Sequence, residues 1–478
     1  MLLVHPVRDL VRFLPALVGI LVFGQSSDGG GRWLLLGVGV PVVLGLARYL
    51  TTSYRITTGR VEVRQGLLNK RVLSAPLDRV RTVDLTASPI HRVLGLVTLR
   101  IGTGQSSGNG EERLALDGLT ATAASGLRER LLHGHVSQLT NRDVAATAAA
   151  GHVVLTLDLR WVRFAPFTSS GVAIAGAALG VVAQSAHTLE ILPSVDLDSA
   201  ARLGAVALVV LGLLGVLLTI CVLAVVGYLL TNFDFQLLRT GTEWHVRRGL
   251  FTTRETTLDQ ARVSGVSIGE PWGLRLAGGA RLSAIVTGLD RRQRGSSVLV
   301  PPAPRAEVER VSAEVLGSAA PVTSRLVGHG PRAHRRRWTR AMVPAGGVAL
   351  GALVAGYAVS WWFLPLAAAA LALGAVLAHD RWRALGHALV DGHLVARSGS
   401  LDRRREALHT ASVIGWNLRA TWFQRRVGLT HLVATTAGGR QQVRVLDLDE
   451  AAATDLAASA TPRLLEEFLT RPPGRPLR

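Results

Sequence analysis

The sequence of 478 residues has one cysteine and one lysine, and aromatic residues make up only 5% of it. The single cysteine, Cys221, excludes an intrachain disulfide, a CxxC redox pair and a cysteine zinc site. The apolar runs have no Asp, Glu, Lys or Arg in their central turns. Ion-coupled carriers usually keep an ionisable group at membrane depth, so the sequence disfavours such a carrier. It does not exclude a neutral pore lined by small residues.

Motifs for catalysis and for metal binding are also missing. The sequence has neither an HExxH nor a GxSxG motif. The glycine-rich segment 102–110 lacks the Lys-Ser/Thr pair and the following helix of a phosphate-binding loop, so it is predicted to be a hairpin loop. His133 and His135 would point apart on a helix and have no further ligands. We therefore predict no enzyme activity, no cofactor and no metal site.

Apolar segments, by contrast, are long and frequent, because hydrophobic residues make up 48% of the chain. Six apolar segments form three pairs: 11–24 with 33–47, 164–185 with 203–230, and the two halves of 341–378. As one helix the last run would be about 57 Å long, nearly twice the roughly 30 Å hydrocarbon core. A turn is therefore predicted around Ser360, Trp361 and Trp362, with the Trp pair at the interface.

The first segment has a second interpretation. It is short and flanked by Arg8 and Arg12, like a signal peptide. No A-x-A-like cleavage site follows, and another apolar segment comes at once. We therefore favour a retained helical hairpin, and six transmembrane helices in all.

The arginines indicate the orientation of these hairpins. The loops inside the pairs hold few basic residues, whereas 331–340 and 379–387 are rich in arginine. By the positive-inside rule, both termini and all soluble regions are predicted to be cytoplasmic in a bacterial inner membrane. The preference for arginine over lysine is typical of high-GC bacterial codon usage. Because topology explains much of the net charge of +20, a nucleic-acid partner is not predicted.

The chain is thus divided into three hairpins, each followed by a soluble domain. The predicted hairpins are 1–50, 161–230 and 339–380, and the predicted domains are 51–160, 231–338 and 381–478.

The three domains share one ordered pattern. Each begins with a turn glycine, a short alternating strand and a second glycine, which is Gly66, Gly249 or Gly399. An arginine follows five residues later in every copy, and these repeat arginines are Arg71, Arg254 and Arg404. Recurrence after each hairpin predicts an internal repeat of hairpin plus domain.

Alternation with a period of two predicts short, half-buried strands, for example at 61–63, 97–101 and 394–397. A helix-like segment closes each domain, at 121–132, 306–316 and 450–469. The predicted fold class is therefore membrane α-helical hairpins plus three small α+β domains, each a bent antiparallel sheet capped by a C-terminal helix.

The framework residues of the first copy are Tyr54, Gly59, Gly66, Leu77, Arg81, Leu94 and Gly95. This pattern resembles the bacterial pleckstrin-homology-like (PH-like) domain of the membrane-flanked type. The third copy matches through Gly392, Gly399, Leu408 and Gly428, and the second matches loosely. The resemblance extends over nearly the whole chain, and it implies a seven-stranded, helix-capped fold with a binding or scaffolding role and no catalytic residues.

Clusters of arginine are candidate contacts to anionic lipid headgroups or to a partner. The candidates are Arg71, Arg254, Arg403, Arg404, Arg405, Arg335, Arg336 and Arg337. Near an anionic leaflet, each basic residue contributes about 1 kcal/mol. The alternative is that these residues only set the topology and are solvated, and the sequence leaves both open.

We expect a non-enzymatic scaffold that presents three cytoplasmic PH-like domains to a protein partner or to the lipid surface. The resemblance implies envelope maintenance or stress resistance, with a smaller membrane protein of the same family as one expected partner. The alternative is a transporter or export component whose domains gate the helices.

Overall fold

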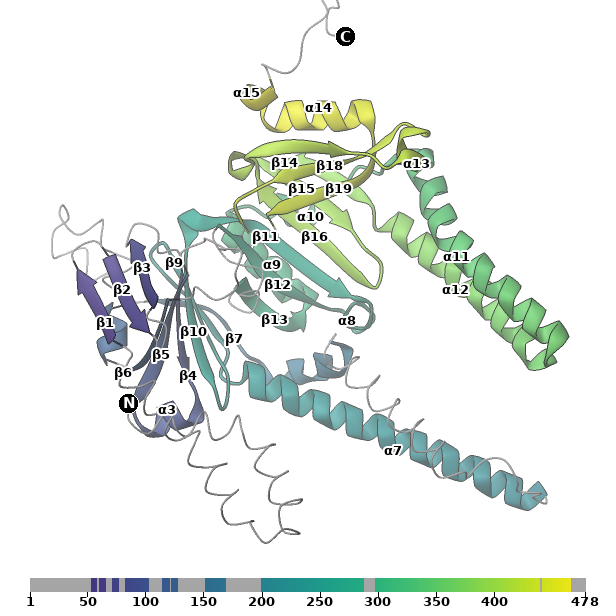
Figure 1. Cartoon of the computed structure of the whole chain (residues 1–478), viewed down its shortest axis with the longest axis horizontal. Helices are drawn as coiled ribbons and strands as arrows, with labels where there is room; N and C mark the ends of the chain where they lie inside the picture. Colours follow the sequence, from purple (N-terminus) through teal and green to yellow (C-terminus); the bar gives the residue numbers. More distant parts are fainter. Residues whose placement is uncertain are drawn as a thin grey trace, which may run out of the picture. The chain divides into compact units, whose positions relative to one another are not determined.

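The computed structural model describes residues 53–57, 60–65, 71–76, 82–102, 114–120, 122–127, 151–168, 199–287, 297–438 and 441–465. These residues form two compact units (Figure 1). Unit 1 contains the described residues up to Thr156 together with 231–262. Unit 2 contains 157–230, 263–287 and 297–465 within the described ranges. The division after Arg262 falls inside the second soluble region, so that region contributes strands to both units.

Unit 1 contains two antiparallel sheets. The smaller consists of β1 (Ser53–Thr57), β2 (Arg60–Gln65) and β3 (Arg71–Pro76). The larger has the order β6 (Leu114–Thr120), β5 (Leu96–Gly102), β4 (Thr82–Ala87), β10 (Thr253–Asp259), β9 (Glu243–Arg248), β8 (Gln236–Thr240) and β7 (His152–Thr156). One continuous sheet thus combines β4–β6 of the first repeat with β8–β10 of the second.

Unit 2 repeats this arrangement. Its six-stranded sheet has the order β13 (Val298–Pro304), β12 (Gly279–Val286), β11 (Val263–Pro271), β16 (Asp402–His409), β15 (His393–Ser398) and β14 (Gly386–Val390). A second sheet consists of β17 (Gly415–Arg419), β18 (Leu429–Thr435) and β19 (Gln442–Asp449). Strands β11–β13 of the second repeat therefore share a sheet with β14–β16 of the third.

Short helices follow the fourth strand of each repeat, and a longer helix closes the second and third. The short helices are α3 (Pro89–Val93), α8 (Trp272–Leu276) and α13 (Trp422–Arg425). The closing helices are α9 (Arg305–Leu316), followed by α10 (Ala320–Thr323), and α14 (Glu450–Ala460), followed by α15 (Pro462–Leu465). The predicted helix 450–469 is interrupted at Thr461 because proline disfavours helical backbone in the residue before it.

Backbone conformation explains why glycine is required at two of the three positions that align the repeats. Gly249 and Gly399 adopt φ of 112° and 104°. A Cβ atom would lie 2.1 Å from the Thr252 carbonyl oxygen in the first case and 2.2 Å from that of Asp402 in the second. Only glycine fits these turns, so the predicted turn positions are confirmed. Gly66 lies outside the described residues.

The connection between two repeats is made by strand pairing, and it occurs twice with one register. In the first joint β4 pairs with β10, and Thr86 lies opposite the repeat arginine Arg254. In the second joint β11 pairs with β16, and Gly269 lies opposite the repeat arginine Arg404. Thr86 and Gly269 each lie nine residues before a positive-φ glycine, Gly95 or Gly278. The predicted separate domains are therefore joined edge to edge into shared sheets.

The core of the third repeat lies between its two sheets and α14. Leu394 and Leu408 contact Leu432, Val445 and residues of α14 in one buried cluster. The prediction that 394–397 is half-buried is wrong for Val395, which is fully buried. The physical reason is that α10 of the second repeat packs against β14 and β15.

Three described helices are long and apolar enough to cross a membrane. They lie within α7 (Ser199–Asn232), α11 (Gly330–Ala358) and the segment that ends with α12 (Leu364–Arg383). The predicted segments 11–24 and 33–47, and most of 164–185, lie outside the described residues, so the count of six remains a prediction. Phe164 does not begin an apolar span, because it lies in a 3₁₀ helix (Leu159–Phe167) and is fully buried.

The third hairpin turns where the sequence predicts. Helix α11 ends at Ala358, Ser360 is extended, and a 3₁₀ turn (Trp361–Phe363) precedes α12. The two helices lie side by side in Figure 1. A Cβ on Gly374 would lie 2.6 Å from the Ala345 Cβ, so small residues allow the close helix contact that is typical of membrane proteins.

Segments that precede and follow a hairpin also pair with each other through backbone hydrogen bonds. Strand β7 precedes the second hairpin and pairs with β8, which follows it. Val327 precedes the third hairpin, and its amide and carbonyl bond with those of His387, which follows it. In the second repeat, β7 is thus a seventh strand beside β8–β13, which matches the number that the resemblance implies.

Candidate functional site at the base of the third hairpin

Two arginines at the start of α11 meet one buried aspartate of the third repeat. Asp447 is fully buried in β19 and adopts a positive φ of 55°. Its Oδ1 lies 2.9 Å from Arg336 Nε, and its Oδ2 lies 2.6 Å from Arg337 Nη2. These contacts are ion pairs, whereas Gln424 Nε2 donates a hydrogen bond of 2.7 Å to Oδ1. Removing one partner of such a buried pair leaves an uncompensated charge, so α11 is held firmly to β19.

The side chains around Asp447 are held in place by further hydrogen bonds. The backbone N–H of Asp447 donates to His431 Nδ1 at 2.9 Å. Burial lowers the pKa of His431, although the nearby Asp447 carboxylate opposes this shift, and a neutral ring leaves Nδ1 free to accept. Gln424 also accepts from the Thr421 backbone N–H in a capping box at the start of α13. The carboxylate is therefore fixed from both the strand and the short helix.

A pair of histidines lies beside this cluster. His329 Nδ1 donates to the Leu446 carbonyl oxygen at 2.7 Å, so its Nε2 accepts from His387 Nδ1 at 3.0 Å. Burial lowers the pKa of His329, and it lowers the pKa of His387 to about 4. Both rings are therefore neutral at pH 7, which suits the bond between them.

The other end of the hairpin is bonded to the second joint. Asp380, near the end of α12, accepts from Arg403 of β16 at 2.8 Å and from Arg275 of α8 at 3.1 Å. The Trp272 backbone N–H donates to the Leu401 carbonyl oxygen at 2.7 Å. One carboxylate thus connects the hairpin with the second and third repeats, and both ends of the hairpin have polar anchors.

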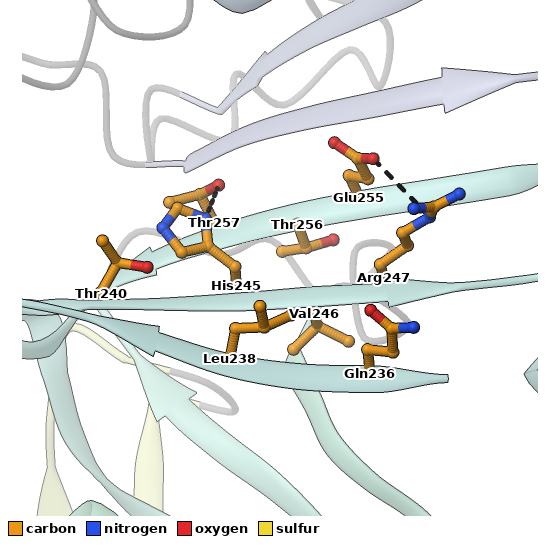
Figure 2. A pocket seen from close by; sticks show the side chains of 9 residues that line it. All are labelled: Gln236, Leu238, Thr240, His245, Val246, Arg247, Glu255, Thr256 and Thr257. Carbon is orange, nitrogen blue, oxygen red and sulfur yellow. Dashed lines mark hydrogen bonds and ion pairs between the residues drawn. The ribbon is translucent and has the colours of Figure 1, made fainter. Parts of the chain in front are cut away.

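Unit 1 has a separate shallow hollow of about 320 Å³ on one face of β8–β10 (Figure 2). Its side chains pair across neighbouring strands, since Arg247 lies 3.9 Å from Glu255 and His245 Nδ1 lies 3.0 Å from Thr257 Oγ1. Such cross-strand pairs stabilise a sheet face. Among the described residues, no group of three His, Cys, Asp or Glu side chains is placed to hold a metal.

The predicted contact residues lie in several places. Arg336, Arg337 and Arg403 form the ion pairs above, and Arg335 is exposed on α11. Arg404 bonds to Asp402, and Arg405 bonds to the carbonyl oxygens of Pro321 and Ser324. Burial lowers the pKa of Arg405 to about 10.

Arg254 lies in the first joint, and the side chain of Arg71 lies outside the description. The described contacts of these arginines are with the protein itself, and contact with lipid or with a partner stays a prediction.

The acidic partners Asp447 and Asp380 were not predicted. Asp447 is one of three acids in 447–450, and nothing in the sequence separates it from its exposed neighbour Asp449. Asp380 could have been predicted from the sequence, because it is the one acid between 341 and 389 and is followed by Arg381 and Arg383. A single acid beside a basic membrane boundary indicates a structural ion pair.

Comparison with protein families gives three matches along the chain. The model described as bacterial PH domain matches residues 10–135, 177–319 and 343–460, which together exceed half of the sequence. The chain belongs to the bacterial PH domain family. Each match begins within a predicted hairpin and continues into the soluble region that follows it. No curated protein and no solved structure matches the chain.

Bacterial PH domains that alternate with long apolar helices indicate a membrane-associated protein. The base of the third hairpin is where these two components meet in unit 2. Its contacts connect a helical hairpin with two successive PH repeats.

Proposed function

We propose that the protein is a non-enzymatic membrane scaffold. Its hairpins hold the PH repeats in a fixed arrangement beside the cytoplasmic leaflet, where the repeats bind a protein partner. The main support is the double anchoring of the third hairpin, through Asp447 at one end and Asp380 at the other. Gating would require the hairpin to move against the repeats and break these pairs, which favours a fixed platform over a gated transporter.

Membrane attachment also explains how weak modules suffice for binding. Domains held beside the leaflet meet a membrane-bound partner at a high effective concentration, so modest affinities add up. Free strand edges offer one mode of recognition, because an extended segment can be added to an exposed sheet edge.

The proposal is tested by affinity capture of the full chain from crosslinked bacterial membranes. We expect a specific membrane or cytosolic partner with the intact protein, and its loss when Asp447→Ala loosens the hairpin from the third repeat. The matched control is Asp449→Ala, which removes an exposed carboxylate two residues away. Recovery of no partner would contradict the scaffold. Flux of a labelled solute into proteoliposomes that depends on the third hairpin would support the transport alternative instead.

The orientation has its own test. Reporter fusions at Gly104 and Gly438 are expected to give cytoplasmic signals, and a fusion at Pro193 an extracytoplasmic one. An extracytoplasmic signal at Gly104 would overturn the proposed topology.

A further inference from the structure

We propose that β17 is a docking edge for strand β3 of a second copy of this chain, so that copies join head to tail. The pairing would be the one that already joins successive repeats within the chain. The proposal concerns self-association and does not depend on the scaffold role.

The chain makes the same joint twice, which defines what each side of it contributes. The fourth strand of one repeat (β4 or β11) pairs antiparallel with the third strand of the next repeat (β10 or β16). Asp84 lies opposite Thr256 in the first joint, and Ser267 lies opposite Glu406 in the second. These two pairs are equivalent, because Thr256 and Glu406 have the same sequence separation from the repeat arginine of their strand. Asp84 and Ser267 likewise have the same separation from the positive-φ glycine that follows their strand. The register is therefore a property of the repeat.

Strand β17 is the fourth strand of the third repeat, and it forms the outer edge of the sheet β17-β18-β19. Among the described strands it pairs only with β18. Its Gly415 lies thirteen residues before Gly428, as Gly265 lies thirteen residues before Gly278. A Cβ on Gly265 would lie 2.0 Å from the Ala407 carbonyl oxygen of the next repeat, whereas a Cβ on Gly415 would meet nothing within 4 Å. Gly415 thus has the space that the joint requires without the strand that fills it.

Burial shows the same difference. Ile268 of β11 is 4% exposed, and its equivalent in β17, Leu418, is 50% exposed. The short helix that follows β17 presents two further exposed aromatic side chains, Trp422 and Phe423. In the second joint the equivalent helix donates the Trp272 backbone N–H to the turn of the next repeat. An outer strand with an exposed leucine, followed by a helix with exposed aromatic side chains, is a surface suited to an added strand.

The strand that fits this edge is present in the chain itself. Strand β3 begins at the repeat arginine Arg71 and is the equivalent of β10 and β16. It is an outer strand of its sheet, and among the described strands it pairs only with β2. The shared register then places Gly415 opposite Ala75, Asn417 opposite Leu73 and Arg419 opposite Arg71. Among the described strands, β3 of the first repeat therefore supplies one unpaired half of the joint, and β17 of the third repeat supplies the complementary half.

One pair in this register is unfavourable. Arg419 lies opposite Arg71, where the internal joints have Thr86 or Gly269 opposite the repeat arginine. Like charges directly opposite each other destabilise a strand pair, so we expect weak association that is populated at membrane concentrations. Because the two surfaces differ, the contact is heterologous and produces rings or open chains rather than a closed dimer.

The test uses the full chain in liposomes, with energy transfer between donor- and acceptor-labelled copies. Wild type is expected to show transfer that rises with protein density, and Gly415→Val is expected to reduce association at least tenfold. Valine suits a strand and meets open space in the single copy, so thermal unfolding of this variant should be unchanged. Equal transfer for Gly415→Val and wild type, or no transfer in wild type, would overturn the proposal.

The register is tested by charge reversal and by crosslinking. Arg419→Glu should strengthen association several-fold and Arg71→Glu should do the same, whereas the double variant, which again places like charges opposite each other, should return association to about the wild-type level. In a Cys221→Ser background, mixing Asn417→Cys copies with Leu73→Cys copies should yield a disulfide-linked dimer, and Ser74→Cys copies should not. Weaker association of Arg419→Glu, or equal crosslinking at both positions, would contradict the register. Crosslinking of Asn417→Cys only to a different protein would overturn the second copy as the occupant.

Discussion

The two joints between repeats have the same backbone register and different side-chain chemistry. The first joint buries the carboxylate of Asp84 opposite Thr256. Burial and the charge of Arg254 together lower the pKa of the neighbouring Arg248 to about 10, although the nearby Asp84 opposes both. The second joint instead depends on a close backbone contact at Gly265 and on Asp380 beside it. The comparison indicates that strand pairing determines the register of the joint, whereas different side-chain contacts stabilise each joint.

Breaking the buried ion pairs at the hairpin should have the largest effect. Asp447→Ala leaves Arg336 and Arg337 without their buried partner, and such a loss costs about 3–5 kcal/mol. Unfolding of the purified full chain, followed by the fluorescence of its tryptophans, measures the change. The exposed pair of Arg332 with Asp449 provides the control, since Asp449→Ala should cost less than about 1 kcal/mol. Equal effects of the two variants would refute the assigned role of Asp447.

Adding a side chain at Gly265 distinguishes the two joints directly. Gly265→Val would bring side-chain atoms against Ala407 and Leu408, and overpacking of this kind costs about 1–3 kcal/mol. The equivalent residue of the first joint is Thr82, which already has a branched side chain. Thr82→Val should therefore change the free energy of unfolding by less than about 0.5 kcal/mol. A larger loss for Thr82→Val than for Gly265→Val would show that the two positions are not equivalent.

Removing the charge of Asp380 should loosen the second joint and leave the first unchanged. Asp380→Asn weakens the bonds from Arg275 and Arg403, and hydrogen bonds to a charged group contribute about 1.5–3 kcal/mol. Because these side chains are partly exposed, we expect about 1 kcal/mol. Hydrogen exchange should become faster in α8 and β16 and stay unchanged in β4 and β10. Arg383→Gln, an exposed change nearby, serves as the control.

Acid should weaken the hairpin base and have little effect on the first joint. Burial lowers the pKa of His329 and His387 below the unfolded value of about 6.5. Below that value the unfolded state binds more protons, so this contribution to stability is complete above about pH 6.5 and is lost as pH falls toward 4. Hydrogen exchange at Val327 and His387, compared between pH 7.5 and pH 5, measures the loss. Replacing His387 by Gln should reduce this pH dependence, and an unchanged pH response would contradict the assignment.

The sequence predicts the repeating unit well because the turns that divide it are specified by short local segments. Positive φ at Gly249 and Gly399 demands glycine, and the turn at Ser360 follows from the length of an apolar run. The partner of an edge strand is different, because β4 and β11 look the same in a pattern of alternation whether they end a sheet or continue it. Asp447 was not predicted for a related reason. The buried Asp447 and an exposed aspartate beside it are the same residue type in the same short segment, so the sequence does not distinguish them.

The shared sheet between repeats is tested most directly by a disulfide across the second joint. Ser267 lies directly opposite Glu406, and residues so placed on antiparallel strands have Cα atoms within disulfide range. In a Cys221→Ser background, Ser267→Cys with Glu406→Cys should form an intrachain disulfide under mild oxidation. Ser267→Cys with Ala407→Cys should not, because successive side chains of a strand point to opposite faces. Failure of the first pair to crosslink, or equal crosslinking of both pairs, would contradict the joint on which the whole account rests.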